Sequence, residues 1–268
     1  MPSSITHLLI AEDASKSFAP KIGNAVRTHP DYFYLGAQGP DPFFFLKILS
    51  KEKNFGSLLH DVPYETFTAF FSRYRSAPDE RAAAYLAGYC SHYATDVVFH
   101  PFVYRYLQQT NAHGMAHQRM ENDWDVFFLR KERGKEAERF PAPFIPAKIV
   151  RDGVIYKLIC SAAVQTEQRL PTERAFRIAL KRFYRFITFF HGKCYKKQRR
   201  WQKFERALHL KPRLSCLYPQ QFPAVLPDEA AAVTFYETAV RETVRLVSLF
   251  FSDALPKIDF SKNLHTGK

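Results

Sequence analysis

Cysteines and long apolar runs are both scarce in this sequence of 268 residues. The four cysteines are irregularly spaced, so they predict neither a Cys-x-x-Cys metal clip nor a disulfide framework. The longest apolar runs, such as residues 42–46, are far shorter than the roughly 20 residues that span a bilayer. The first 16 residues lack the basic start and long apolar stretch of a secretory signal. We therefore expect a soluble, cytoplasmic protein with reduced thiols.

The composition is that of a folded chain, with 46% hydrophobic and 16% aromatic residues. No internal repeat or low-complexity tract is present, which excludes a solenoid. The net charge of +13 is uneven, because residues 1–130 carry 12 Lys and Arg against 13 Asp and Glu, and the remainder carries 27 against 13. A basic excess of this kind attracts the phosphates of nucleic acid or anionic lipid, although a solvated face without a partner has the same composition.

Apolar residues recur at helical spacings along most of the chain, which predicts an all-α protein. The stretch 28–42 is rich in Gly and Pro and predicts an irregular loop, and residues 140–146 form a proline-rich connector. We expect a metal-site helical half over residues 1–135 and a basic helical remainder over 136–268, packed into one domain. A first helix, capped by Ser3 or Ser4, is predicted to run to about residue 15, and a short one follows Pro20. Further helices are predicted over residues 43–60, 64–75, 81–99, 111–131, 147–167, 172–191 and 228–252.

Residues 88–101 (GYCSHYATDVVFHP) carry His92, Asp96 and His100 at intervals of four. Side chains at i and i+4 share one helical face, so His92 and Asp96 can close on one cation. Pro101 is expected to end the helix and turn His100 toward a neighbouring site.

The following predicted helix repeats the pattern with His117 and Glu121. A histidine and an acid four residues apart are more often a surface pair, but two such pairs, one of them on an apolar helix, favour a shared metal centre. Imidazole and carboxylate ligands suit zinc.

Residues 34–41 (YLGAQGPD), then 88–101 and 117–121, resemble the zinc-dependent phospholipase C family of bacteria. That family is similar in fold to the single-strand-specific fungal and plant nucleases that also use three zinc ions. The resemblance covers residues 7–125 and implies a single multi-helix domain of this all-α type.

The resemblance also implies a ligand set. Two zinc ions are expected and a third is uncertain, because secreted family members complete the third site with an N-terminal tryptophan, whereas this sequence begins Met1-Pro2. The Asp41 carboxylate is the implied general base. The implied ligands are Asp41, His60, His92 and Asp96 for the first zinc, His100, His117 and Glu121 for the second, and His7 with a bridging Asp96 for the third.

Simpler interpretations of single residues stay open at this point. Asp41 suits a turn or helix cap, His60 a core or helix-end position, and His7 the surface. The adjacent pair His60-Asp61 occurs in another helical class of metal phosphohydrolases, but that class leaves the two helical His/carboxylate pairs unexplained. His113, near His117, is expected to be a solvent-facing loop residue rather than a ligand. His29, His191, His209 and His265 lack partners at metal-binding spacing.

The implied activity is phosphodiester hydrolysis by a metal-activated water, with phospholipid as the expected substrate class. Two alternatives are a nuclease with the same metal site and a non-catalytic binding protein stabilised by its metals. The basic run at residues 196–201, close to several aromatics, suits peripheral contact with an anionic membrane, although a helix with solvated lysines has the same pattern. No obligate protein partner is inferred.

Overall fold

The computed structural model describes residues 4–46, 54–137, 153–191, 194–221, 228–252, 260–264 and 266–267, and these residues form helices and connecting segments with no strand. The all-α prediction is confirmed. No described helix is both long and apolar enough to cross a membrane. The elements, in order, are α1 (Ser4–Ser15), α2 (Pro20–Thr28), α3 (Pro30–Ala37), η1 (Asp41–Phe45), α4 (Phe55–Asp61), α5 (Pro63–Ser76), α6 (Glu80–Gln109), α7 (Ala116–Arg133), α9 (Val154–Gln165), α10 (Glu173–His191), α11 (Cys194–Ala207), η3 (Ser215–Leu217) and α12 (Glu229–Phe251).

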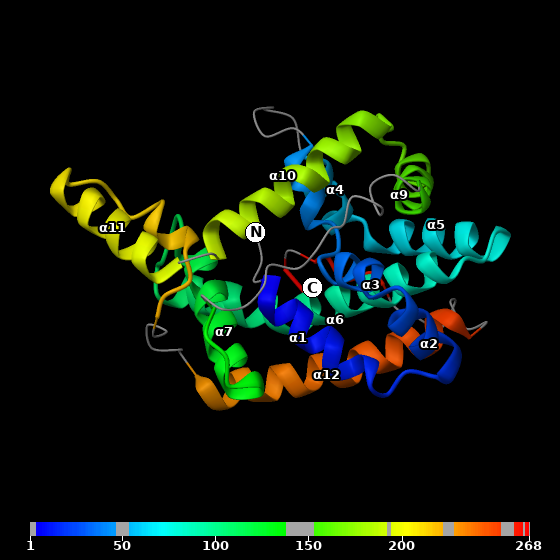
Figure 1. The fold of residues 1–268 in the computed structure, drawn as a ribbon, viewed down its shortest axis with the longest axis horizontal. Helices are drawn as coiled ribbons and strands as arrows, with labels where there is room; N and C mark the ends of the chain where they lie inside the picture. The colour runs from blue at the N-terminus through cyan, green and yellow to red at the C-terminus, as the bar shows by residue number, and fades with distance from the viewer. Residues whose placement is uncertain are drawn as a thin grey trace.

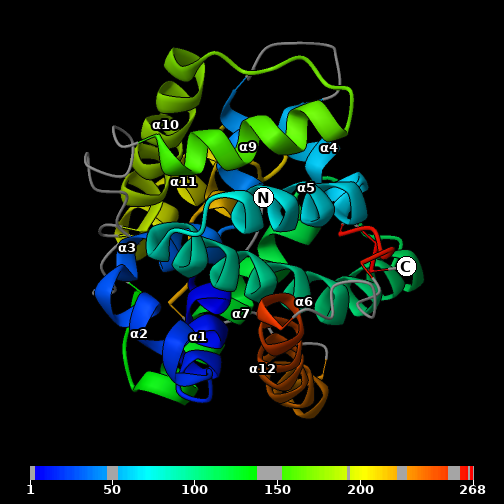
Figure 2. The same ribbon diagram turned by 90° about the vertical axis from the view of Figure 1, so that its right-hand side faces the viewer.

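Helix α6, with 30 residues, runs through the middle of the molecule. Its first turn is capped by Asp79, whose side chain accepts hydrogen bonds from the backbone N–H groups of Arg81 and Ala82. Helix α12 lies along one side of α6, and α5 and α9 lie on the other side (Figures 1 and 2). Helix α6 is therefore covered on several sides. This explains why its buried residues lie all around the helix and are not confined to one face.

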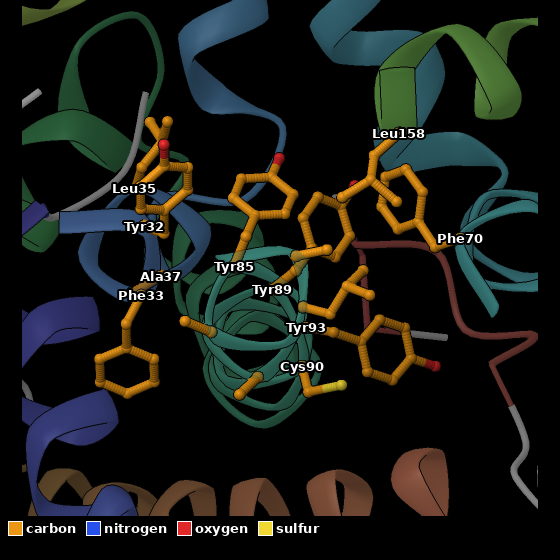
Figure 3. Close-up of a cluster of buried hydrophobic side chains, with 14 of the residues drawn as sticks. Tyr32, Phe33, Leu35, Ala37, Phe70, Tyr85, Tyr89, Cys90, Tyr93 and Leu158 are labelled. Atoms are coloured by element: carbon orange, nitrogen blue, oxygen red, sulfur yellow. The ribbon is translucent and has the colours of Figure 1, made fainter. Parts of the chain in front are cut away.

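Helices α3 and α6 touch at their backbones. A methyl group added at Gly36 would lie 2.0 Å from the carbonyl oxygen of Tyr85, and one added at Gly88 would lie 2.2 Å from that of Phe33. Only glycine permits this approach. In Figure 3, residues of α3 lie to one side of α6, and Phe70 lies to the other. The close crossing places the end of α3, and η1 beyond it, over the histidines of α6.

Two buried clusters hold the remaining helices. The larger one surrounds α6 and includes Phe67, whose ring stacks on Phe260 at 3.7 Å between centroids. The second joins α1, α7 and α12 around Phe99, which meets Trp124 edge to face at 4.8 Å. Helices from the later part of the chain thus complete the core around the earlier ones.

Several predicted boundaries were wrong. Residues 28–42 are not a loop, because Pro30 begins α3 and the apolar side chains of Tyr32 and Phe33 are buried in the core. The helix predicted over 43–60 is replaced by η1 and α4, with residues 47–53 outside the described part. Helix α6 does not end at Pro101 but continues to Gln109, so His100 stays helical. The connector at 140–146 also lies outside the described residues.

Candidate metal centre

Helix α6 supplies three polar side chains in a row at its buried middle. The Oδ2 atom of Asp96 lies 3.1 Å from Nε2 of His92, and its Oδ1 atom lies 4.0 Å from Nε2 of His100. All three residues are buried. Because they are spaced by four, they form one line along the helix, with the carboxylate between the imidazoles.

Helix α1 brings His7 to this line from the side. Its Nε2 atom lies 3.3 Å from Oδ1 of Asp96, and its ring stacks on that of His92 at 4.4 Å. The start of α1 is held by the buried Asp125, whose carboxylate accepts hydrogen bonds from the backbone N–H groups of Ile5 and Thr6 and from the Thr6 hydroxyl. A carboxylate at a helix N-terminus satisfies donors that lack helical partners. Asp125 thus fixes the helix that carries His7.

Asp41 at the start of η1 and His60 near the end of α4 close the other side. The His60 Nε2 atom lies 3.3 Å from Oδ1 of Asp41 and 3.9 Å from Oδ2 of Asp96. The Nδ1 atom of His60 lies 2.7 Å from the carbonyl oxygen of Gly56, an arrangement in which Nδ1–H donates and Nε2 remains a ligand atom. Asp96 therefore lies within 4.0 Å of four histidines.

The turn before Asp41 passes so close to the His92 ring that it needs a glycine at position 39. Gly39 has φ +51, and a Cβ atom there would lie 2.2 Å from Cδ2 of the His92 ring. Glycine is required for both the left-handed backbone and the close approach. The carbonyl oxygen of Ala37 lies 3.3 Å from Nδ1 of His92, which turns Nε2 toward Asp96.

His100, His117 and Glu121 form a second group where α6 meets α7. The Oε1 atom of Glu121 lies 2.8 Å from Nε2 of His117 and 3.6 Å from Nε2 of His100. The His117 side chain is 29% exposed, whereas that of Glu121 is 5% exposed. This group therefore borders solvent at His117.

A segment near the end of the chain fixes ligands of both groups. Leu264 donates its backbone N–H to the carbonyl oxygen of His60 at 2.9 Å, and its own carbonyl accepts from Nδ1 of His100. Asn263 donates its side-chain N–H to Oδ1 of Asp61 at 2.8 Å. The segment has no helical periodicity and lies far from the ligands in sequence, so sequence reasoning missed it, as it missed Asp125.

The charges within the centre compensate one another. Burial alone would raise the pKa of Asp96, but the imidazoles of His92 and His100 hold it well below its ordinary value. Burial alone would lower the pKa of His100, but Asp96 and Glu121 raise it to about 9. Burial and the nearby His92 lower the pKa of His7, which favours the neutral form that binds metal. Asp96 is thus ionised, as a metal ligand must be.

The donor set fits zinc. Within the described part of the chain, buried oxygen and nitrogen atoms of Asp41, His92, Asp96 and Glu121 make no hydrogen bond of normal geometry, an arrangement that is costly unless a ligand satisfies it. Imidazole and carboxylate donors in such clusters suit zinc. The side chains fall into three groups whose ligand atoms lie within 4.8 Å of one another, namely His7, His92 and Asp96; Asp41, His60 and His92; and His100, His117 and Glu121.

All eight residues singled out by sequence lie in these three groups. The group at α7 has the membership expected for the second zinc. Asp96 falls in the group of His7, rather than in that of Asp41 and His60, and His92 belongs to both. His113 instead hydrogen-bonds Asn111 at an exposed site, and His29 lies 3.7 Å from Glu80, also away from the centre. The number of ions that the centre holds stays a prediction.

Comparison with known proteins agrees with this geometry. A family model described as zinc dependent phospholipase C matches residues 6–177, which is more than half of the chain and includes every residue of the three groups. No curated protein and no solved structure matches the chain significantly. The chain belongs to the zinc-dependent phospholipase C family.

Proposed function

We propose that this protein is a zinc-dependent phosphodiester hydrolase of the phospholipase C type, acting on phospholipids. The observation that carries the proposal is the contiguity of the three ligand groups: His92 belongs to two of them, and Asp96 lies within 4.0 Å of histidines from all three. A structural zinc is usually closed by four ligands at one ion, whereas eight donors with one partly exposed edge suit a polynuclear catalytic centre. Family membership supports the same reaction class.

Zinc ions, when bound, supply positive charge that neutralises phosphate oxygens and lowers the pKa of a bound water toward neutrality. The chain's own contribution is orientation and proton transfer. Backbone carbonyls of Gly56, Ala37 and Leu264 face the Nδ1 atoms of three histidines, so each Nε2 faces the centre.

Asp41 is proposed as the general base and as a ligand. Its carboxylate is buried, and neither oxygen makes a hydrogen bond of normal geometry to a described residue. An oxygen of Asp41 takes the proton as the water oxygen bonds to phosphorus. The bond from phosphorus to the glycerol oxygen breaks, that oxygen receives a proton from solvent, and Asp41 then releases to solvent the proton that it took from the water. The products are a diacylglycerol and a phosphorylated headgroup.

The test is a combined measurement of metal content and hydrolysis. We expect the purified, zinc-supplemented protein to hold at least two ions by elemental analysis and to release phosphorylated headgroup from phospholipid near neutral pH. The matched pair of variants is Asp96→Asn, in the centre, and His29→Ala, outside it; only the first should lose activity.

The substrate panel separates the alternatives. Cleavage of single-stranded DNA but not of phospholipid would indicate a nuclease with the same centre. A zinc-loaded protein that cleaves neither, nor a soluble model diester, would overturn the proposal in favour of a metal-stabilised binding protein.

A further inference from the structure

Helix α11 and the loop after it project from one end of the molecule (Figure 1). We call residues 194–214 the basic arm, because they include eight Lys and Arg but a single acid, Glu205. Every residue from 206 to 214 is exposed. The basic arm therefore concentrates positive charge on a protruding element. Its first residues, Cys194 and Tyr195, are anchored in the second buried cluster, and none of its residues belongs to the three ligand groups.

The same region also exposes apolar side chains. Among the described residues, five of the nine exposed large hydrophobic side chains lie on the basic arm or on the adjoining end of α10. Isolated exposed apolar residues are ordinary, but a cluster surrounded by charge marks an interaction surface. The five are Phe189, Phe204, Leu208, Leu210 and Leu214, and each is at least 42% exposed.

The loop that carries the leucines is held in place. Glu205 is buried, and its carboxylate accepts hydrogen bonds from the backbone N–H groups of Arg213 and Leu214 at 2.8 Å and from the Ser215 hydroxyl at 2.5 Å. Beyond the loop, Asn122 of α7 donates a 2.7 Å hydrogen bond to the carbonyl of Cys216. The Glu205 carboxylate thus faces the protein interior and hydrogen-bonds the end of the loop, while the leucines of the loop are exposed to solvent.

An open cavity of about 380 Å³ lies between α11 and the end of α10. Lys197 lies 4.5 Å from the centroid of the Phe189 ring and donates to the Phe189 carbonyl at 2.6 Å. Cationic groups next to aromatic walls suit a phosphate with an attached apolar chain. The lining residues are Phe189, Lys197, Arg200, Trp201, Phe204 and Tyr218.

We propose that the basic arm docks the protein on an anionic phospholipid bilayer. Leu208, Leu210 and Leu214 enter the boundary between headgroups and acyl chains, and the surrounding Lys and Arg side chains face lipid phosphates. The leucines favour lipid over nucleic acid, because aliphatic side chains insert into lipid but offer no ring on which a base can stack.

Membrane docking goes beyond the proposed function, since it needs no metal. The docking surface and the metal centre are nevertheless joined by packed helices. Helix α10 precedes the basic arm and packs on η1, where the rings of Phe183 and Phe45 meet at 5.8 Å. Arg182 donates to the Phe45 carbonyl at 3.4 Å. The element that begins with Asp41 is therefore connected through one helix to the docking surface.

The experiment compares co-sedimentation of the full chain with vesicles of phosphatidylcholine alone and vesicles that also contain phosphatidylserine. Binding is expected to the anionic vesicles alone and to weaken as salt is raised. Replacing the three leucines together (Leu208→Ser, Leu210→Ser, Leu214→Ser) should weaken it by about ten-fold or more. The matched control is Val164→Ser with Leu170→Ser, which removes exposed apolar side chains elsewhere.

Two further readouts keep the outcomes distinct. Hydrolysis of a soluble diester should be unchanged in the leucine variant, which shows an intact centre and separates failed docking from a failed proposed function. Asp96→Asn should still bind vesicles. The inference is overturned if wild-type protein ignores anionic vesicles, if it binds single-stranded oligonucleotide instead, or if the leucine and control variants bind vesicles alike.

Discussion

The metal centre and the basic arm are both dense in ionisable side chains, but they place them in opposite ways. In the centre, Asp96 is buried within 4.0 Å of four histidines, so each charge is compensated by a neighbour. In the basic arm the single acid is buried, and every Lys and Arg except the half-buried Lys197 is exposed. Buried acids and imidazoles that neutralise one another hold a few ligand atoms at fixed distances, which suits binding of a small ion. Exposed groups of positive charge instead attract a negatively charged surface. This contrast is the reason why we propose catalysis for the first region and membrane docking for the second.

The largest effect that tests this contrast is expected at Asp41. Asp41→Asn keeps an oxygen for the metal but removes the base, so the rate of diester hydrolysis should fall by a factor on the order of 10² to 10⁴. Metal content should fall far less. The measurement is kcat together with elemental analysis of the same sample. A rate close to wild type would remove Asp41 from the role of base.

The amount of zinc lost on substitution should differ between residues of the centre. Asp96 lies within 4.0 Å of four histidines, which come from all three ligand groups, whereas His7 contributes a ligand atom to one group and pairs with Asp96. Asp96→Asn should therefore cost more bound zinc than His7→Ala when both are titrated side by side. Equal losses would mean that Asp96 is not shared between ions.

A matched pair of glycines tests how closely the backbone fits the centre. Gly39→Ala meets a positive φ and a contact of 2.2 Å with His92, whereas Gly114→Ala meets a positive φ with open space around it. Strain of this kind costs about 1 to 3 kcal/mol of unfolding free energy, and only Gly39→Ala should also lower zinc affinity. Denaturant unfolding and zinc titration give both values, and equal behaviour of the two variants would refute a role for the fit at Gly39.

The smallest effect is expected in the basic arm. Glu205→Gln should lower stability by at most about 1 to 3 kcal/mol, the usual range for a hydrogen bond to a charged group, and should leave zinc content unchanged. Vesicle binding should weaken, because the leucine loop loses its anchor. A variant with normal vesicle binding would show that the loop does not need Glu205.

The stabilisation of the leucine loop by Glu205 should weaken as the pH falls. Burial alone would raise the pKa of Glu205, but hydrogen bonds from Ser215 and from backbone N–H groups lower it. Because the folded-state pKa lies below the ordinary value of 4.5, the stabilisation is complete above that value and is lost as the pH falls through the lowered one. Hydrogen exchange of the loop amides at decreasing pH measures the loss.

Sequence reasoning reached the all-α fold and the eight centre residues by two routes. The pairs on α6 and α7 follow from i, i+4 spacing, which depends on local geometry alone. Asp41, His60 and His7 came through family resemblance, because no spacing rule joins residues of different elements. Asp125 and Leu264 were missed because their roles arise from tertiary contacts with distant residues.

The errors in secondary structure have a common cause. Gly36 was counted as a turn former in residues 28–42, but it serves the close crossing of α3 and α6. Pro101 was expected to end α6, but the helix continues through it. In both cases tertiary packing outweighed the local preference of one residue. Gly39, with its positive φ, is the residue for which the turn interpretation holds.

The contact between Leu264 and His100 joins residues 164 positions apart, which has a consequence for the order of biosynthesis. At the usual rate of about 5 to 20 residues per second, His100 leaves the ribosome roughly 8 to 33 s before the carbonyl that orients it. Contacts so distant in sequence also form slowly during folding. The helices that carry the ligands are therefore made early, and the orientation of His100 becomes final only when Leu264 arrives.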